Sequence, residues 1–225
     1  MNWQFFDLPL QEDLEAEFTE KLRAAYIASF FGQTYPLDGL PFESLKKRLK
    51  NSTDLAVLVT DAPDPFLGYA IFSAPEALLE GKKIIWQDSI GIDKSLQGKG
   101  FAKEVYDLMK SKIPDSGWLG GRTQNPAIIR SFCNKGVSFP FDELYSSKTG
   151  KNIFSFLKEN IQEVRESEGI DTTTGIIKAN YPLRLGNYEN NWTGIEKQKR
   201  FLEQHGFDQN AGDAVIIVVD ELASR

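Results

Sequence analysis

The sequence predicts an α/β protein, and three observations support this fold class. Segments with the two-residue period of strands and segments with the 3.6-residue period of helices follow one another over most of the chain. A strand-like segment, a glycine-bearing turn and a helix-like segment succeed one another from Lys83 to Ile113. The run Ala214–Val219 is the most apolar in the chain and is typical of a buried strand.

The N-terminal third is expected to form two helices and a hairpin. Leu10–Phe31 carries apolar residues at helical spacing, and Gly32–Pro41, rich in glycine and proline, is expected to be a loop. Phe42–Lys50 has the pattern of a short basic amphipathic helix. Leu55–Val59 and Leu67–Ser73 are apolar runs on either side of a proline-containing turn, which predicts paired strands.

The middle of the chain reads as strand, helix, strand, helix. Lys83–Ile92 is expected to be a strand and Gly100–Ile113 a helix that stops before a proline. Trp118–Thr123 predicts a short strand, and Pro126–Asn134 predicts a helix closed by glycine. Val137–Tyr145 is expected to be irregular or extended.

The last third departs from this pattern. Ile153–Glu166 and Trp192–His205 are expected to be helices, and Gly169–Gly186 has β-like stretches broken by turn residues. Ala214–Val219 then forms the last strand, which could complete the sheet of its own subunit or that of a second copy in a homodimer. No linker marks a domain boundary, so we expect a single domain over residues 1–225.

Composition narrows the class of protein. The formal net charge of -6 argues against nucleic-acid binding and favours a cationic acceptor such as an amine. Cys133 and His205 are the only residues of their types, so neither a disulfide nor a zinc site is expected, and we expect no metal. No segment has the roughly 20 apolar residues of a membrane span. The N-terminus lacks a signal-peptide pattern, so we expect no membrane association and a cytoplasmic location.

The segment Ile90–Ala102 carries the clearest functional signal. Glycine at positions 98 and 100 lets backbone N–H groups converge at positive φ, and the helix that follows adds unpaired N–H groups and its positive dipole end. Such a turn can receive a pyrophosphate. The spacing matches neither Gly-x-x-x-x-Gly-Lys-[Ser/Thr] nor Gly-x-Gly-x-x-Gly, since Lys103 occupies the last glycine position. An ordinary glycine-rich turn is the alternative.

These residues resemble the GNAT superfamily of acyl-CoA N-acyltransferases. Gln97, Gly100 and Ala102 fill the fixed positions of its signature [Gln/Arg]-x-x-Gly-x-[Gly/Ala], and Asn125–Gly136 resembles its Asn-to-Gly helix one strand later. The resemblance covers about residues 55–139. It implies a mixed central sheet flanked by helices, with residues 150–212 as an insertion before the last strand that is not typical of the family.

The resemblance also implies that acetyl-CoA is the co-substrate. In this family two neighbouring parallel strands part, and the pantetheine arm satisfies their unpaired backbone groups. Backbone N–H groups of the turn would hold the pyrophosphate, and Asn125 would approach the pantetheine or the sulfur. The residues assigned to the cofactor are Ile90, Ile92, Gln97, Gly98, Lys99, Gly100, Phe101, Ala102, Asn125 and Phe132.

For catalysis, Asp88 is our candidate general base. It lies on the strand that would point at the thioester, on the face expected to be shared with Trp86, Ile90 and Ile92, while Gln87, Ser89 and Gly91 share the other. Partial burial would raise the pKa of this carboxyl toward a useful range. Alternatively, Asp88 only caps the strand or pairs with a lysine.

The general acid is less defined. The family places a tyrosine on the second helix, and the matching residue here is Phe132, which has no proton to give. Ser131 or a water could substitute. Cys133 is expected to be a buried structural thiol, and His205 to cap a helix end.

The acceptor is expected to be a small-molecule or peptide amine. Its site would form from the loop before the second helix and from the insertion, and the candidate lining residues are Tyr35, Asp38, Phe42, Glu43, Tyr181, Tyr188 and Trp192. Because of Phe132, a non-catalytic acyl-CoA-binding or regulatory module is the second reading. An unrelated nucleotide-phosphate binder is the third.

Overall fold

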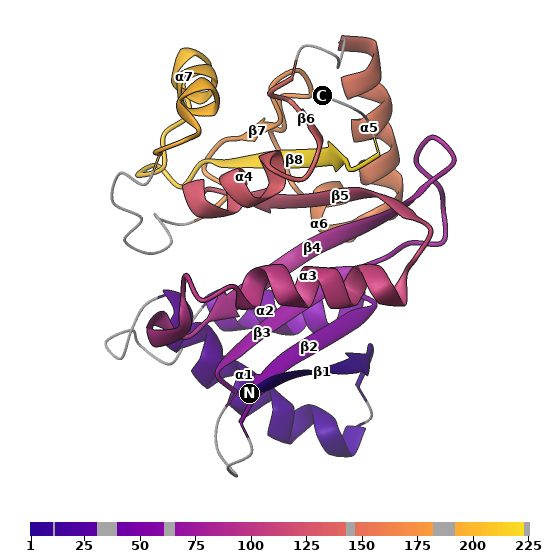
Figure 1. The fold of residues 1–225 in the computed structure, drawn as a ribbon, viewed down its shortest axis with the longest axis vertical. Helices are drawn as coiled ribbons and strands as arrows, with labels where there is room; N and C mark the ends of the chain where they lie inside the picture. Colours follow the sequence, from indigo (N-terminus) through magenta and orange to yellow (C-terminus); the bar gives the residue numbers. More distant parts are fainter. Residues whose placement is uncertain (11, 31–39, 61–65, 143–146, 182–191, 223–225) are drawn as a thin grey trace. The chain divides into compact units, whose positions relative to one another are not determined.

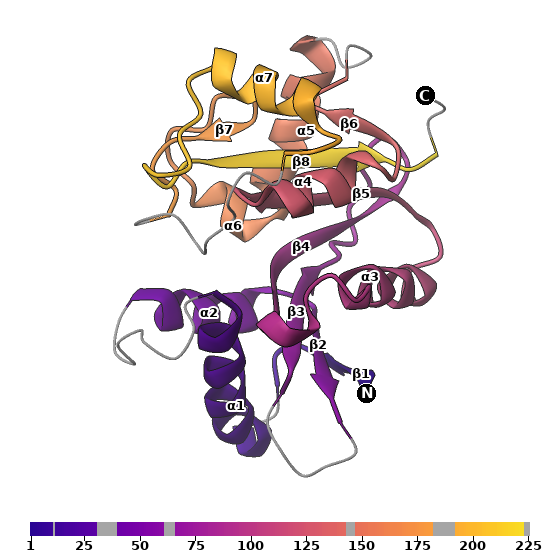
Figure 2. The same cartoon turned by 60° about the vertical axis from the view of Figure 1, so that its left-hand side comes forward.

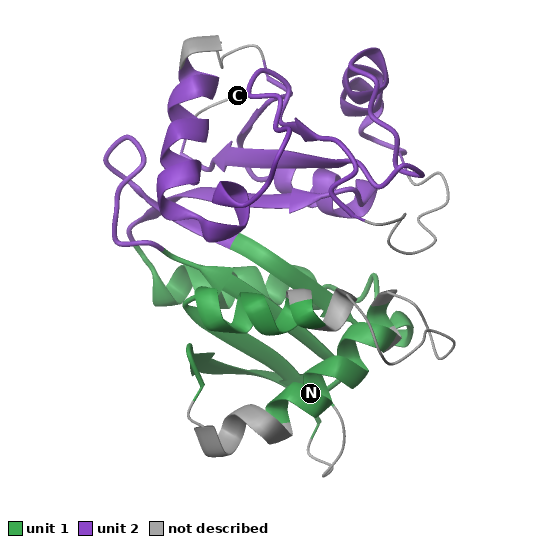
Figure 3. Ribbon diagram, turned by 180° about the vertical axis from the view of Figure 1, so that it is seen from behind, with its two compact units in different colours: residues 1–74, 87–114 green, residues 75–86, 115–225 purple. Residues whose placement is uncertain are grey.

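A computed structural model describes the chain except residues 11, 31–39, 61–65, 143–146, 182–191 and 223–225 (Figure 1). The chain divides into two compact units (Figure 3). Unit 1 comprises Met1–Ala74 and Gln87–Pro114, and unit 2 comprises Pro75–Trp86 and Asp115–Arg225. The strand β4 (Lys83–Ile92) contributes its first residues to unit 2 and the rest to unit 1. The fold class is α/β, with a mixed sheet flanked by helices, as predicted.

The sheet of unit 1 has the order β1-β2-β3-β4. Its first three strands are β1 (Asn2–Asp7), β2 (Asp54–Val59) and β3 (Gly68–Ser73). Both pairs among these strands are antiparallel, with Trp3 opposite Leu58 and Leu55 opposite Ile71, so the expected hairpin is confirmed. We did not expect a strand at β1. It is a short edge strand in which only Trp3 is buried, so its sequence carries little of the pattern of a buried strand.

Helices cover both faces of this sheet. The helices are α1 (Glu12–Phe30), α2 (Leu40–Asn51) and α3 (Phe101–Lys112). Figure 2 shows α1 and α2 on one face and α3 on the other. Leu22, Leu45 and Tyr69 belong to the core between the first two helices and the sheet. Helix α2 begins at Leu40, two residues before the predicted helix start at Phe42, because proline fits the first turn of a helix.

The sheet of unit 2 has the order β4-β5-β8-β6, with β7 also paired to β8. Its strands are β5 (Ser116–Thr123), β6 (Val137–Phe139), β7 (Ile176–Ile177) and β8 (Ala214–Asp220). Strand β8 pairs antiparallel with β5, β6 and β7 of its own chain, so it completes the sheet of its own subunit.

The helices of unit 2 are α4 (Pro126–Cys133), α5 (Ser147–Asn160), α6 (Gln162–Arg165) and α7 (Glu196–Gln204). Side chains of α5 and α6 pack with Trp86, Trp118 and Ile216 in one apolar core. The single helix expected over Ile153–Glu166 is two helices, since Ile161 adopts an extended conformation between them. Among the described residues, no helix is long and apolar enough to cross a bilayer.

Candidate functional site

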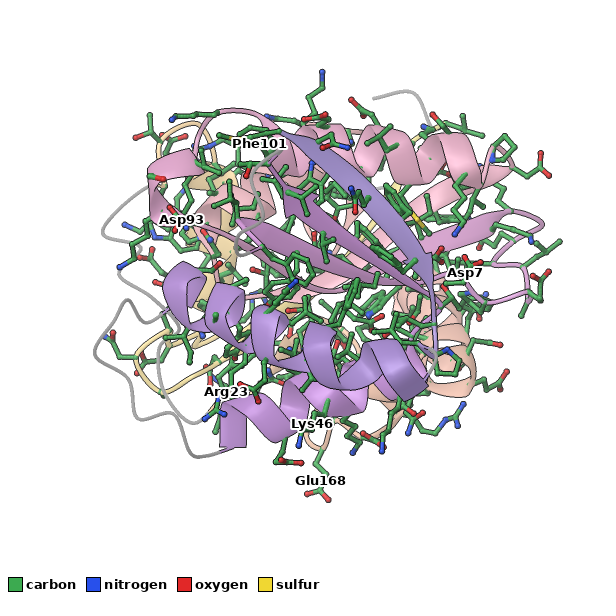
Figure 4. The ribbon with its side chains drawn as sticks, turned by 90° about the horizontal axis from the view of Figure 1, so that it is seen from below. Asp7, Arg23, Lys46, Asp93, Phe101 and Glu168 are labelled. Carbon is green, nitrogen blue, oxygen red and sulfur yellow. The ribbon has the colours of Figure 1, made fainter. Side chains whose placement is uncertain are left out.

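Residues 93–102, which we call the glycine turn, join β4 to α3 within unit 1. Asp93 starts the turn: its Oδ1 accepts hydrogen bonds from the Ser95 amide (2.8 Å) and hydroxyl (2.6 Å). A single 3-10 turn, η2 (Lys94–Leu96), follows. The Gln97 Nε2 then donates to the Ile92 carbonyl at 2.9 Å and so ties the turn to the end of β4. Figure 4 shows Asp93 and Phe101, the start of the turn and of α3, on one side of unit 1.

Two glycines give the turn its shape. Gly98 has φ 78° and Gly100 has φ 93°, a region that other residues rarely adopt. A Cβ at either position would meet nothing within 4 Å. Backbone conformation, and not crowding, therefore requires glycine here.

The backbone amides at the start of the turn are mostly paired, whereas most of those at its end are not. Leu96 donates its amide to the Asp93 carbonyl at 2.9 Å, and Lys99 donates to Leu96 at a longer 3.3 Å. Within the described part of the chain, no backbone acceptor takes the amides of Gly98, Gly100, Phe101 or Ala102, and Gly100 caps α3 without a side-chain hydrogen bond. Orphan N–H groups at a helix N-terminus, combined with the helix dipole, favour an anion.

The side chains around the turn are mixed in charge. Lys94, Lys99 and Lys103 are exposed, and Glu104 is the acidic residue in the first turn of α3. Lys103 lies 3.9 Å from Asp107 in an exposed pair. Since the Lys99 amide already bonds to a carbonyl, the exposed ammonium of Lys99 is the group it can offer to an anion.

The second half of β4 faces α1. The Ser89 hydroxyl lies 3.0 Å from the hydroxyl of Tyr69, which packs on Tyr26 of α1 with ring centroids 6.2 Å apart. Gly91 points the same way, because a Cβ there would lie 2.8 Å from the Ser29 Oγ of α1. Ser89 and Gly91 therefore share the face covered by α1.

The alternation breaks at the middle of β4. A regular strand would put Gln87 on the same face as Ser89. Instead, the Gln87 Oε1 accepts a 2.5 Å hydrogen bond from Tyr106 of α3, the helix on the opposite face. Asp88 bonds to Ser73, which lies four residues after Tyr69 in β3 and therefore shares its α1 face.

Asp88 and Ser89 thus contact the same face, as happens where a β-bulge adds a residue. The expectation that Asp88 shares a face with Ile90 and Ile92, and that Gln87 shares the other with Ser89 and Gly91, is wrong at this point. A local irregularity of the backbone cannot be read from a two-residue period.

Asp88 connects three elements of unit 1. Its Oδ2 accepts hydrogen bonds from Ser52, just after α2, at 2.8 Å and from Ser73 of β3 at 2.5 Å. The residue is only 9% exposed. Two hydroxyl donors on one oxygen hold the buried Asp88 carboxyl group in a fixed orientation. Ile90 and Ile92, farther along the strand, are half-buried.

The other assigned residues lie on α4 in unit 2. Asn125 is the N-cap: its Oδ1 accepts from the Ala127 amide at 2.9 Å. Phe132 is 1% exposed, so its ring packs inside the unit. Ser131 is half-buried. Cys133 is a buried thiol near the Ser138 hydroxyl (3.6 Å), as expected.

The structure describes only some of the expected acceptor residues. Tyr35, Asp38 and Tyr188 lie outside the described residues, as does the side chain of Phe42. Glu43 is exposed and pairs with Lys46 at 3.4 Å, and Trp192 is half-buried. His205 ends α7, where its Nδ1 lies 2.8 Å from the Phe201 carbonyl, so its predicted capping role is confirmed.

Sequence reasoning missed a polar cluster around Arg122 of β5. The guanidinium donates to Asn180 (2.7 Å) and Ser167 (3.0 Å), bonds to Glu163 and lies over the Tyr181 ring at 5.6 Å. The signal was an arginine inside a strand that is otherwise buried. Tyr181 alone had been considered, as an acceptor residue.

Comparisons with known proteins find similar solved structures but no similar sequences. No protein-family model and no curated protein matches the chain. Among solved structures, the chain is similar to acetyltransferases. The ribosomal-protein-S18-alanine N-acetyltransferase from Escherichia coli is 10% identical, with TM-score 0.43 over 100% of this chain and 97% of that one. Tetrahymena GCN5 is 10% identical, with TM-score 0.46 over 67% and 86%.

A ribosomal-protein-alanine N-acetyltransferase from Brucella melitensis biovar Abortus 2308 is 18% identical, with TM-score 0.40 over 60% of this chain and 89% of that one. The NatC complex, solved with Gag peptide and CoA, gives 14% identity and TM-score 0.39 over 60% and 84%.

Proposed function

We propose that the protein is a GNAT-type N-acetyltransferase that binds acetyl-CoA through the glycine turn and acetylates a primary amine. The unpaired amides of Gly98, Gly100, Phe101 and Ala102 carry this proposal. Two of them belong to the positive-φ glycines and the other two to the first residues of a twelve-residue helix, an arrangement that suits a diphosphate.

The residues present fit this group. Acetyl-CoA would supply an acetyl group activated as a thioester and a diphosphate that needs N–H donors. The open space around Gly98 and Gly100 lets an anion approach the backbone closely. Gln97 serves indirectly, by fixing the turn to Ile92.

Asp88 is the proposed general base. An ammonium has no lone pair, so the amine must lose a proton before it can attack a carbonyl, and a carboxylate can accept that proton directly or through water. The two serine donors hold the Asp88 carboxylate in one orientation. The net charge of -6 favours the approach of a cationic amine. We also propose that the protein acts in the cytoplasm.

Replacing one turn glycine tests the cofactor site. Gly100→Val should weaken acetyl-CoA binding by about tenfold or more, because a β-branched residue cannot keep the positive φ that aims the Phe101 amide. Gly169→Val is the matched control: Gly169 is also exposed, has φ 67° and has nothing within 4 Å of its Cβ. Isothermal titration calorimetry gives both affinities.

Equal affinities for the two variants would contradict the proposal. A thermal-shift measurement distinguishes the acetyltransferase from an unrelated nucleotide-phosphate binder, since a specific ligand raises the melting temperature. We expect a shift with acetyl-CoA that excess ATP does not remove.

A second candidate function is a non-catalytic acyl-CoA-binding module. The buried phenylalanine at position 132 favours it, because no hydroxyl proton is available there for a leaving thiolate. Acetyl-CoA binding without thiol release across a broad panel of amines would support this second function.

A further inference from the structure

The C-terminal end of β5 is enclosed by two other segments of unit 2. Arg122 donates to Asn180 at 2.7 Å, and the next residue, Tyr181, donates its amide to the Gly212 carbonyl at 2.9 Å. The Gly212 amide donates to Gln209 at 3.1 Å, and the Gln209 side chain bonds back to the carbonyl of Gln124. These bonds close a ring from β5 through residues 180–181 and 209–212 to β5 again.

Gln124 is the unexplained residue of this ring. It is 2% exposed, and within the described residues neither its Nε2 nor its Oε1 has a hydrogen-bond partner. It lies two residues after Arg122, so in an extended chain both side chains point to the same face. Arg122 Nε and Asn180 Nδ2 are likewise buried without partners there.

Buried polar atoms in folded proteins are nearly always hydrogen-bonded. Here three nitrogen donors and one oxygen acceptor, which come from neighbouring residues, lack partners among the described side chains and backbone. A ligand group with one acceptor and one donor would pair with both atoms of the Gln124 carboxamide, and any further acceptor could pair with the other two nitrogen donors.

The charge balance narrows the class of that group. The Arg122 guanidinium is already paired with the Glu163 carboxylate, with side chains 10% and 13% exposed, so the cluster is close to neutral. An anion would also meet the Gln124 Oε1, which repels it. An amide matches both atoms of the Gln124 carboxamide, since its C=O accepts and its N–H donates.

We propose that Gln124, Arg122 and Asn180 form a subsite for an amide group of a bound ligand. Two sources share this chemistry: the backbone of a peptide acceptor and the pantetheine arm of acetyl-CoA. The amide subsite itself does not depend on the proposed function; only the assignment of its ligand as a substrate of acetyl transfer does.

Gln124→Met tests the subsite, because methionine has a similar volume and removes both polar atoms. The binding affinity is compared for two pairs of probes. In the first pair, glycyl-glycinamide carries an amide and 1,4-diaminobutane is an amine without one. In the second pair, acetyl-CoA carries pantetheine and adenosine 3′,5′-bisphosphate lacks it. The substitution should weaken the binding of one amide-bearing probe by about tenfold and leave the affinity for the other member of that pair unchanged. Loss for the dipeptide identifies a peptide acceptor, and loss for acetyl-CoA identifies pantetheine.

A second readout uses the wild type alone. The side-chain NH₂ signals of Gln124, assigned through bonds from its own backbone amide, should shift when the wild type is titrated with the bound probe. Unchanged affinities and unshifted signals, or no binding of either amide-bearing probe to the wild type, would overturn the proposal. A wild type that binds the dipeptide but not acetyl-CoA would contradict the acetyltransferase function and leave the amide subsite intact.

Discussion

Gly91 of β4 lies so close to Tyr69 of β3 that a Cβ on the glycine would be 2.6 Å from the Tyr69 Cε1. The same Cβ would be 2.8 Å from the hydroxyl oxygen of Ser29 in α1. Tyr69 is fully buried and bonded to Ser89, so its ring has little room to move. The close approach of β4 to α1 thus depends on a residue without a side chain.

Gly91→Ala should therefore destabilise unit 1. Overpacking in a close-packed core costs about 1–3 kcal/mol, and chemical denaturation would measure the loss as a lower midpoint with an unchanged slope. An unchanged midpoint would show that α1 moves away without cost.

Asp88→Asn should separate catalysis from binding. The amide keeps an oxygen that can accept from Ser52 and Ser73, so we expect the fold to persist. Loss of a general base lowers turnover by about 10²–10⁴-fold, whereas acetyl-CoA affinity should stay within about twofold. Steady-state kinetics with thiol detection and calorimetry check both values.

Ser73→Ala is the control for this variant, since it removes one donor and keeps the carboxylate. An Asp88→Asn variant that turns over at the wild-type rate would limit Asp88 to joining α2, β3 and β4.

Breaking the Arg122–Glu163 pair from one side should cost more than removing both partners. Arg122→Met leaves the mostly buried Glu163 carboxylate without its guanidinium, which costs about 3–5 kcal/mol. The double variant Arg122→Met with Glu163→Leu should recover part of this loss. A double-mutant cycle from urea unfolding measures the coupling, and additive losses would show that the pair contributes nothing as a unit.

Asp213 should contribute to stability in a pH-dependent way. Burial disfavours its charge, but donors at Lys178, Asp208 and Ala179 outweigh burial and hold the pKa of Asp213 below its ordinary 3.8. A lowered pKa in the folded state gives stability that is present above about pH 3.8 and is lost as the pH falls through the folded value.

Asp213→Asn should accordingly lower the free energy of unfolding by about 1–3 kcal/mol at pH 7. The difference from wild type should narrow below about pH 3.8. Unfolding by urea between pH 3 and pH 7 tests this, and a difference independent of pH would mean that the lost charge is not its cause.

Much of the fold is predictable from local pattern. Lys83–Ile92 is a strand with the predicted bounds, and α3 begins one residue after the predicted Gly100. The edge strand β1 was missed because only one of its residues is buried. The break between α5 and α6 at Ile161 was missed because the apolar pattern runs through it.

By itself, the sequence determined most of the order of strands and helices and the place of the glycine turn. Periodicity and positive-φ glycines are local properties, fixed by residues only a few positions apart. Tertiary structure alone decided that Asp88 bonds to Ser52 and Ser73 and that Gln87 and Ser89 point to opposite faces. It also decided that the Gln124 side chain is buried with no hydrogen-bond partner among the described residues. Those contacts join residues tens of positions apart, and only packing of the whole chain brings such residues together.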